Sequence, residues 1–323
     1  MRRALVTGCA GFIGSHLTES LLEDGIEVVG VDCFNDNYGR RDKLRNLERA
    51  GSWEGFDFVP IDLARGDLEE FVAECDVTFH LAAEPGVRSS WGKRFETYVR
   101  NNVIGTQHLL DAARNWPERR FVFASSSSVY GQAETFPTPE DTVPRPLSPY
   151  GVTKLTAENL CHAYHADYGL DVVSLRYFSV YGPRQRPDMA FSIFCSAALA
   201  GEEVTVFGDG TQTRDFTFVD DIVDATRRAA SARTVAGHLF NIGGGSQVSL
   251  NQAIAVIEEL SGRSLPVIRN PRQRGDVRDT CADTTRARRK LGLDRTVDIR
   301  VGLQRQFAWL CEETRRADGA VLH

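Results

Sequence analysis

The chain has 323 residues, of which 42% are hydrophobic and 25% charged, and this ordinary globular composition excludes a disordered chain. Lys and Arg number 38 against 44 Asp and Glu, so the formal net charge is -6, which argues against nucleic-acid binding driven by bulk charge. The seven cysteines are scattered, odd in number and without a CxxC pair, which indicates neither a zinc site nor a disulfide framework and fits a reducing cytoplasm.

The N-terminal residues enter a short apolar run, Ala4–Thr7, without the long apolar stretch and cleavage site of a signal peptide. No segment approaches the roughly 18 consecutive apolar residues that a membrane span needs. We therefore expect a cytoplasmic protein with no membrane or nucleic-acid partner.

The first half of the chain alternates short apolar runs with longer helical patterns. The expected strands are Ala4–Thr7, Glu27–Val31, Phe56–Ile61, Asp76–Leu81, Arg120–Ala124 and Val172–Arg176. The expected helices between them include Ser15–Asp24, Val99–Asn115 and Tyr150–Tyr168. Such alternation predicts parallel strands joined by crossover helices, and strands rich in Val, Ile and Phe indicate a sheet covered on both faces. The predicted fold class is α/β, with a Rossmann-type doubly wound parallel sheet.

The pattern changes after Gly182-Pro183, where turns separate a strand at Val204–Phe207 from helices at Asp220–Ser231 and Leu250–Leu260. We expect residues 1–178 to form the sheet domain, with a return segment near 215–245. Residues 179–323 are expected to form mainly a smaller, discontinuous α/β domain at the C-terminal side of the sheet. The tail after Glu312 is expected to fray.

A glycine-rich loop follows the first strand. Gly8, Gly11 and Gly14 form GxxGxxG between a strand and a helix, the context in which this motif binds a pyrophosphate at a helix N-terminus. Asp32 ends the next strand, where a carboxylate accepts hydrogen bonds from the adenosine ribose and repels a 2′-phosphate. Residues 1–178 are therefore predicted to bind NAD rather than NADP.

Tyr150 and Lys154 lie four residues apart at the start of a helical pattern, so both side chains share one helix face. A nearby ammonium stabilises a phenolate and lowers the tyrosine pKa from about 10 toward neutrality. This makes Tyr150 a candidate general base toward a sugar or alcohol hydroxyl. Such a pair is common by chance on amphipathic helices, but here it follows a dinucleotide loop at a suitable distance.

Four serines, Ser125 to Ser128, stand at the carboxyl end of a predicted strand, where ligands bind in open parallel sheets. Their hydroxyls suit a polyhydroxylated substrate. The alternative is a serine-rich turn that caps its own backbone.

Together these motifs resemble the extended short-chain dehydrogenase/reductases of the nucleotide-sugar epimerase/dehydratase family, over nearly the whole chain. Further matching segments are Asp62-Leu63, Leu81-Ala82-Ala83, Asn101-Asn102, Arg176-Tyr177-Phe178, Tyr181-Gly182-Pro183, Gly208-Asp209-Gly210 and Arg214-Asp215-Phe216. The resemblance implies a tightly held NAD, a nucleotide-diphosphate sugar and transient oxidation at sugar C4. It also implies a homodimer formed through helices such as Val99–Asn115 and Thr153–Tyr168, although their apolar faces equally fit burial within one chain.

The resemblance assigns catalysis to Tyr150, Lys154 and Ser126, without a metal ion. The cofactor residues it implies are Gly8, Gly11, Phe12, Ile13, Gly14, Asp32, Asp62, Leu63, Leu81, Ala82, Ala83, Asn102, Ser125, Tyr150, Lys154 and Tyr177. The substrate residues it implies are Gly86, Val87, Arg88, Ser127, Ser128, Ser179, Arg186, Thr205, Val206, Phe207, Arg214, Arg274 and Asp276. Among these, Arg214 is expected at the diphosphate and residues 205–207 at the nucleobase, whereas the loop of Arg274 and Asp276 departs from the spacing of several relatives.

The three residues before Val129 separate the family's reactions. The pattern there is Thr-Asp-Glu in 4,6-dehydratases and Thr-Ser-Glu in UDP-glucuronate decarboxylases, whereas this chain has three serines, Ser126 to Ser128. With neither acid present, dehydration and decarboxylation are disfavoured and 4-epimerisation remains.

The group on sugar C5 separates the epimerases. The stretch from Tyr181 to Ala190, with Arg-Pro-Asp-Met-Ala at its end, is similar to UDP-glucuronate 4-epimerases, and Ser179 replaces the Asn usual in neutral-sugar epimerases. An arginine offers a bidentate partner to a C6 carboxylate, and Arg186 is the first choice and Arg88 the second, unless either is a solvated loop residue or a diphosphate ligand. We therefore expect conversion of UDP-glucuronate to UDP-galacturonate. The alternatives are a UDP-glucose 4-epimerase, then a UDP-glucuronate decarboxylase or C4 reductase, and lastly a non-catalytic NAD-binding sensor.

Overall fold

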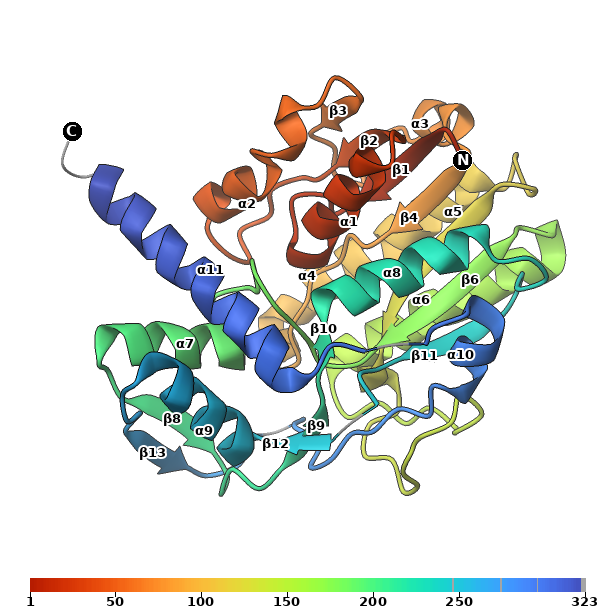
Figure 1. Ribbon diagram of the computed structural model, residues 1–323. Coiled ribbons are helices and arrows are strands. Elements are labelled where there is room, and N and C mark those ends of the chain that lie inside the picture. The colour runs from red at the N-terminus through yellow and green to blue at the C-terminus, as the bar shows by residue number, and fades with distance from the viewer. Residues whose placement is uncertain (246, 274, 295, 321–323) are drawn as a thin grey trace.

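The computed structural model describes residues 1–245, 247–273, 275–294 and 296–320. Its centre is a seven-stranded sheet in the order β11-β6-β5-β4-β1-β2-β3 (Figure 1). The strands are β1 (Arg3–Thr7), β2 (Glu27–Val31), β3 (Phe56–Val59), β4 (Val77–His80), β5 (Arg120–Ser126), β6 (Val172–Tyr177) and β11 (Leu239–Ile242). All neighbouring pairs are parallel. The predicted α/β class with a doubly wound parallel sheet is confirmed.

Helices cover both faces of the sheet because successive residues of each strand point to opposite sides. Ala4 and Val6 of β1 pack into one core with α1 (Phe12–Glu23) and α8 (Val219–Ser231), which lie beside each other in Figure 1. Leu5 packs into a second core with α3 (Glu69–Glu74), α5 (Gly105–Ala113) and α6 (Pro149–Tyr168). Strands β2 and β3 lie on one side of β1, and β4, β5 and β6 lie on the other. The topological switch point of the sheet is therefore between β1 and β4, and open parallel sheets bind ligands at such a point.

A smaller layer covers the carboxyl edge of the sheet. It contains the parallel pair β8 (Val204–Phe207) and β13 (Val267–Asn270), the helices α7 (Ala190–Ala200) and α9 (Leu250–Ser261), and α11 (Ile299–Ala320). The remaining elements are α2 (Arg40–Leu47), α4 (Phe95–Tyr98), α10 (Thr285–Leu291), β7 (Val180–Tyr181), β9 (Thr213–Asp215), β10 (Thr217–Phe218), β12 (Gln247–Ser249), η1 (Ala50–Ser52), η2 (Arg88–Ser90), η3 (Gly92–Arg94), η4 (Val99–Ile104) and η5 (Ser127–Val129). Strand β11 brings the chain back to the large sheet beside β6 after it has passed through β8, β9 and β10.

The prediction that the chain frays after Glu312 is wrong, since α11 continues to Ala320. Leu303 of this helix is fully buried and Phe307 packs against the core, so the helix is anchored at its start. Further along, Oε2 of Glu313 lies 3.1 Å from Nε of Arg45 on α2. Figure 1 shows α11 running from α7 and α9 toward α2. None of the helices in the described part of the chain combines the length and the apolar character needed to cross a membrane.

Two predicted boundaries differ from the structure for local reasons. The single helix expected over Val99–Asn115 is divided into a π-helical segment, η4, and the α-helix α5. Strand β5 was expected to end at Ala124 but pairs with β6 as far as Ser126, and the Ser125 hydroxyl donates to a buried acceptor, Oε2 of Glu158, at 2.9 Å.

His80 at the end of β4 makes stability depend on pH. Its ring is fully buried, with Nδ1 2.8 Å from the Thr7 hydroxyl and Nε2 2.8 Å from the Thr106 hydroxyl, and burial lowers its pKa to about 3. The ring of His80 therefore takes up a proton near pH 6.5 in the unfolded chain but only near pH 3 in the folded chain. Its contribution to the free energy of unfolding is present above pH 6.5 and is lost as pH falls toward 3. Between pH 6.5 and 5 the expected loss is about 2 kcal/mol.

Denaturant unfolding at the two pH values measures this loss. His80→Gln should unfold more readily at neutral pH but lose about 2 kcal/mol less on acidification. His162→Gln, which changes an exposed histidine of α6, should lose as much free energy of unfolding between the two pH values as wild type. An equal loss of unfolding free energy in His80→Gln and wild type would show that His80 does not cause this pH dependence.

Candidate active site

A cavity of about 810 Å³ lies at the carboxyl edge of the large sheet, under the smaller layer. The segments that follow β1 to β6 line one side, and residues 185–194 and β8 line the other. Every predicted site residue in the described chain lines this cavity except Asn102. Arg274, predicted to bind substrate, lies outside the described residues.

The glycine loop after β1 brings two stretches of backbone into close contact. Gly8 has φ +74°, and a Cβ on it would lie 2.8 Å from the backbone nitrogen of Ala82. A Cβ on Gly14 would lie 2.1 Å from the Gly8 carbonyl oxygen. Only glycine therefore fits these positions, and the first turn of α1 faces the cavity with its free N–H groups. This backbone cradle fits the pyrophosphate of a dinucleotide.

Asp32 after β2 lines the same cavity and accepts a hydrogen bond from the backbone nitrogen of Phe34 at 2.8 Å. Burial raises the pKa of this carboxyl, while the charge of Lys43 lowers it. Lys43 is itself only 3% exposed and donates to the backbone oxygen of Asn35 at 2.9 Å. The carboxylate thus has a cationic neighbour that the sequence analysis missed.

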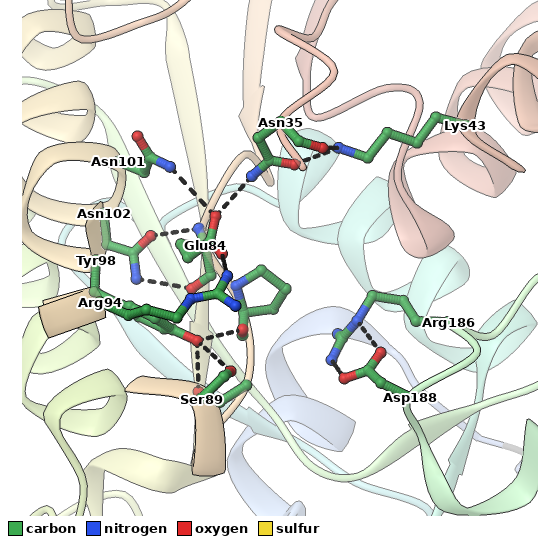
Figure 2. A network of polar contacts seen from close by, with 12 residues as sticks. Asn35, Lys43, Glu84, Ser89, Arg94, Tyr98, Asn101, Asn102, Arg186 and Asp188 are labelled. Atoms are coloured by element: carbon green, nitrogen blue, oxygen red, sulfur yellow. Dashed lines mark hydrogen bonds and ion pairs between the residues drawn. The ribbon is translucent and has the colours of Figure 1, made fainter. Parts of the chain in front are cut away.

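A buried carboxylate, Glu84, joins the loops around this end of the cavity (Figure 2). It is 2% exposed, and its Oε2 accepts from Nδ2 of Asn35 at 2.7 Å and from Nδ2 of Asn101 at 3.3 Å. Its Oε1 accepts from Nη2 of Arg94 at 2.9 Å. The network fixes the loop after β4 against the loop after β2, and no spacing in the sequence indicates it.

Asn102, predicted to contact the cofactor, has a different place in the structure. Its Oδ1 accepts from the backbone nitrogen of Glu84 at 2.6 Å, and its Nδ2 donates to the Glu84 carbonyl and to the Thr153 hydroxyl, each at 3.0 Å. Asn102 thus ties the loop after β4 to α6. Its neighbour Asn101 lines the cavity instead, because η4 turns the two side chains in different directions.

The predicted catalytic residues lie together. Ser126 ends β5, and Tyr150 stands in the first turn of α6, whose start is capped by Ser148. Burial raises the pKa of Tyr150, while its hydrogen bond with Ser126 and the positive charge of Arg186 act in the opposite direction. The phenol therefore has its hydroxyl partner in place and a cation nearby.

Lys154 lines the same cavity as Tyr150, and its side chain also bonds to the neighbouring strand. Its Nζ donates to the carbonyl oxygen of Ala124 on β5 at 2.8 Å, and burial lowers its pKa to about 8. Of the influences on the pKa of Tyr150, the charge of Arg186 is the smallest, after burial and the hydrogen bond with Ser126. The helix face was predicted, but the hydrogen bond to β5 depends on the packing of α6 against the sheet.

Three arginines line the substrate half of the cavity. The Arg186 guanidinium lies near Tyr150 and forms a two-point ion pair with Asp188. Arg214 donates to the backbone oxygens of residues 213, 277 and 278, which hold its guanidinium in place.

Arg88 lies at the other end, among the residues predicted to meet the nucleobase. Its Nη2 is 2.7 Å from Oδ2 of Asp276, and its guanidinium stands 4.5 Å from the centre of the Phe207 ring. This placement favours the nucleotide end for Arg88 and leaves Arg186 as the arginine near the reacting group. Among the described residues, no cluster of three or more His, Cys, Asp or Glu side chains is arranged to hold a metal ion.

Comparisons with known proteins agree with this geometry. The profile of the NAD dependent epimerase/dehydratase family matches residues 4–243. A Bacillus subtilis protein named "Uncharacterized UDP-glucose epimerase YtcB" is 43% identical over 309 residues, which cover 95% of this chain and 98% of the relative. The crystal structure of UDP-glucuronic acid 4-epimerase from Bacillus cereus, in complex with UDP-glucuronic acid and NAD, superposes with a TM-score of 0.93 at 42% identity, covering 96% of this chain and 99% of that one. MoeE5, solved with NAD and either UDP-glucose or UDP-glucuronic acid, has a TM-score of 0.87 and 42% identity in both complexes, covering 97% and 96% of this chain and 99% of its own.

Proposed function

The chain belongs to the NAD-dependent epimerase/dehydratase family, and on this basis we propose that it is an NAD-dependent 4-epimerase that converts UDP-glucuronate to UDP-galacturonate. The observation that carries the proposal is the composition of one end of the cavity. Ser126 and Tyr150 adjoin a cation, Arg186, and no carboxylate stands among the three residues before Val129. This set can move a proton at a sugar hydroxyl and hold an anionic sugar, but it lacks the acid that the dehydratase and decarboxylase patterns carry.

NAD is held by the Gly8–Gly14 loop and by Asp32, and when bound it accepts a hydride from sugar C4 and returns it to the other face. Tyr150 takes the proton of the C4 hydroxyl, with Ser126 in the relay, and later gives it back. Lys154 fixes α6 to β5 through its bond to Ala124 and so keeps the phenol in position. Between the two proton transfers the 4-keto sugar turns about its bonds to the diphosphate and presents its other face.

The rest of the cavity accommodates the remaining parts of the substrate. The diphosphate lies at Arg214, whose guanidinium is preoriented by three backbone oxygens. The nucleobase lies along β8, near Phe207 and Arg88. The C6 carboxylate is bound by Arg186 and by the hydroxyls of Ser127 and Ser128.

Proton NMR tests the function directly. Purified protein is incubated with UDP-glucuronate while the anomeric and H4 signals are followed and CO2 is trapped. A growing UDP-galacturonate signal without CO2 is the expected result. UDP-pentose with CO2 would identify a decarboxylase and contradict the proposal.

Arg186→Ala separates the charged substrate from the neutral one. A charge-assisted bidentate contact contributes about 1.5–3 kcal/mol, so kcat/KM for UDP-glucuronate should fall about 10- to 100-fold. The same variant should leave kcat/KM for UDP-glucose within about threefold, because that sugar has no carboxylate. Equal losses for both sugars would place Arg186 at the diphosphate or in a structural role.

Ser127 and Ser128 are proposed to suppress a side reaction. A 4-keto uronic acid is a β-keto acid, and it loses CO2 fastest when the bond from C5 to the carboxylate lies perpendicular to the carbonyl plane. Hydrogen bonds from these two hydroxyls hold the carboxylate away from that geometry. The Ser127→Ala/Ser128→Ala double variant should raise the ratio of CO2 to epimer severalfold, whereas Ser196→Ala on the exposed side of α7 should not. An unchanged ratio in the double variant would reject this role.

A UDP-glucose 4-epimerase is the second candidate, and two observations favour it. The relative from Bacillus subtilis carries that name, and the charge of Arg186 is already compensated by Asp188. Turnover of UDP-glucose that is indifferent to Arg186→Ala, with none of UDP-glucuronate, would select it.

We also propose a cytoplasmic homodimer. Ile104, Val152 and Tyr168 on η4 and α6 are 41%, 44% and 50% exposed, which supports association through these helices. Sedimentation velocity at micromolar concentration tests the oligomeric state, and a monomer throughout would reject it.

A further inference from the structure

Two arginine–aspartate pairs line the substrate half of the cavity. In one, Nε of Arg186 donates to Oδ1 of Asp188 and Nη2 donates to Oδ2, both at 2.9 Å. In the other, Arg88 pairs with Asp276. Each cation thus already has a carboxylate partner within the chain.

The Arg186–Asp188 pair is built into one turn. The backbone nitrogen of Met189 donates to the carbonyl oxygen of Arg186 at 3.1 Å, so the carboxylate is held beside the guanidinium just before α7 begins. Only 16% of the Arg186 side chain is exposed, against 54% for Asp188. Figure 2 shows the two side chains facing each other, apart from the Glu84 network.

The geometry of this pair is the geometry that a substrate carboxylate would adopt. A guanidinium binds a carboxylate best through two parallel N–H···O bonds, and Asp188 already occupies the edge formed by Nε and Nη2. A second carboxylate must displace Asp188 or share the guanidinium with it at close range. In both cases the negative charge of Asp188 weakens the binding of an anionic sugar and has little effect on a neutral one.

We propose that Asp188 determines sugar specificity: it is an internal counter-ion that competes with the C6 carboxylate of the substrate for Arg186. This inference rests on the proposed 4-epimerase function. With a neutral hexose the ion pair stays closed and no partly buried charge is left without a partner. With a uronate, the C6 carboxylate of the sugar must bind the guanidinium of Arg186 against the repulsion of the negative charge of Asp188. Selectivity between the two sugars is the difference of these two free energies.

Asp188→Asn tests the proposal, because it removes the charge and keeps the shape and one acceptor oxygen. In the holoenzyme, kcat/KM for UDP-glucuronate should rise about fivefold or more, mainly through a lower KM. The value for UDP-glucose should change less than about twofold. Calorimetric titration of the holoenzyme with each UDP-sugar should show the same pattern in Kd.

Asp276→Asn is the matched control. It removes the counter-ion of Arg88 by the same chemical change, but at the UDP end, which both substrates share. It should therefore change kcat/KM for the two sugars by the same factor. The double variant Arg186→Ala/Asp188→Asn should show no rise in kcat/KM for UDP-glucuronate, since it lacks the guanidinium for which Asp188 and the sugar carboxylate compete.

Two outcomes overturn the inference. Equal changes for both sugars in Asp188→Asn would make Asp188 a structural residue, and a selective loss for UDP-glucuronate would mean that Asp188 orients Arg186 instead of competing for it. Failure of the 4-epimerase proposal is visible separately, because the wild-type protein would then form the C4 epimer of neither sugar.

Discussion

Replacement of Tyr150 by phenylalanine is expected to lower kcat for 4-epimerisation about a thousandfold. The variant keeps the ring of Tyr150 and removes only the group that exchanges a proton with the C4 hydroxyl. Ser126 alone is a poor base, since its own hydroxyl needs an acceptor for the proton. KM should stay within a few-fold of wild type, because the phenol contributes little to the binding of the UDP group.

Single-turnover and steady-state assays on the purified holoenzyme measure this effect. Tyr98→Phe is the matched control: its ring stands edge-on to that of Tyr150 at 6.3 Å, and its hydroxyl donates to the carbonyl oxygens of residues 85 and 86. It should lower kcat less than about tenfold. Comparable losses in the two variants would show that the phenol of Tyr150 acts through packing rather than proton transfer.

Glu158→Leu is expected to reduce the free energy of unfolding by about 3–5 kcal/mol. Both side chains of the Glu158–Arg176 pair are 5% exposed, and the carboxylate accepts from Nη2 of Arg176 at 2.6 Å and from Nε at 3.0 Å. It also accepts from the Ser125 hydroxyl. Removal of the acid leaves the guanidinium of Arg176 charged and without a counter-ion inside the protein.

Chemical denaturation at neutral pH measures this loss. The double variant Glu158→Leu/Arg176→Leu should recover at least about 2 kcal/mol, because it removes the unpaired charge as well. Glu259→Ala breaks an exposed ion pair with Arg300 and should cost about 0.5 kcal/mol or less. A double variant as unstable as the single one would show that lost packing, rather than the unpaired charge, dominates.

The sequence predicts those parts of the fold that depend on neighbouring residues. The alternation of apolar runs located the six strands that lead up to the substrate layer, and the glycine spacing located the turn in which Gly14 packs on Gly8. The i, i+4 spacing placed Tyr150 and Lys154 on one face of α6. Each of these features needs only a local pattern and the twist of a parallel sheet.

The remaining features depend on tertiary contacts that no local pattern encodes. Glu84 meets Asn35 across 49 positions of the chain, and Arg88 meets Asp276 across 188. A carboxylate or an arginine in a loop looks the same in sequence whether it faces solvent or a partner of this kind. For this reason Arg88 could not be placed at the nucleotide end in advance, and the counter-ion of Arg186 was not recognised.

The long helix α11 has a mechanical consequence. Its 22 residues span about 33 Å; its first turns pack beside α9, and Glu313, about 21 Å along the helix, pairs with Arg45 on α2. A tilt of the smaller layer by about 10° about the start of α11 would therefore displace Glu313 by about 4 Å. The separation of Arg45 and Glu313 is thus a sensitive gauge of how far the cleft is closed, and a pair of dyes placed beside these two residues would convert that angle into a fluorescence signal.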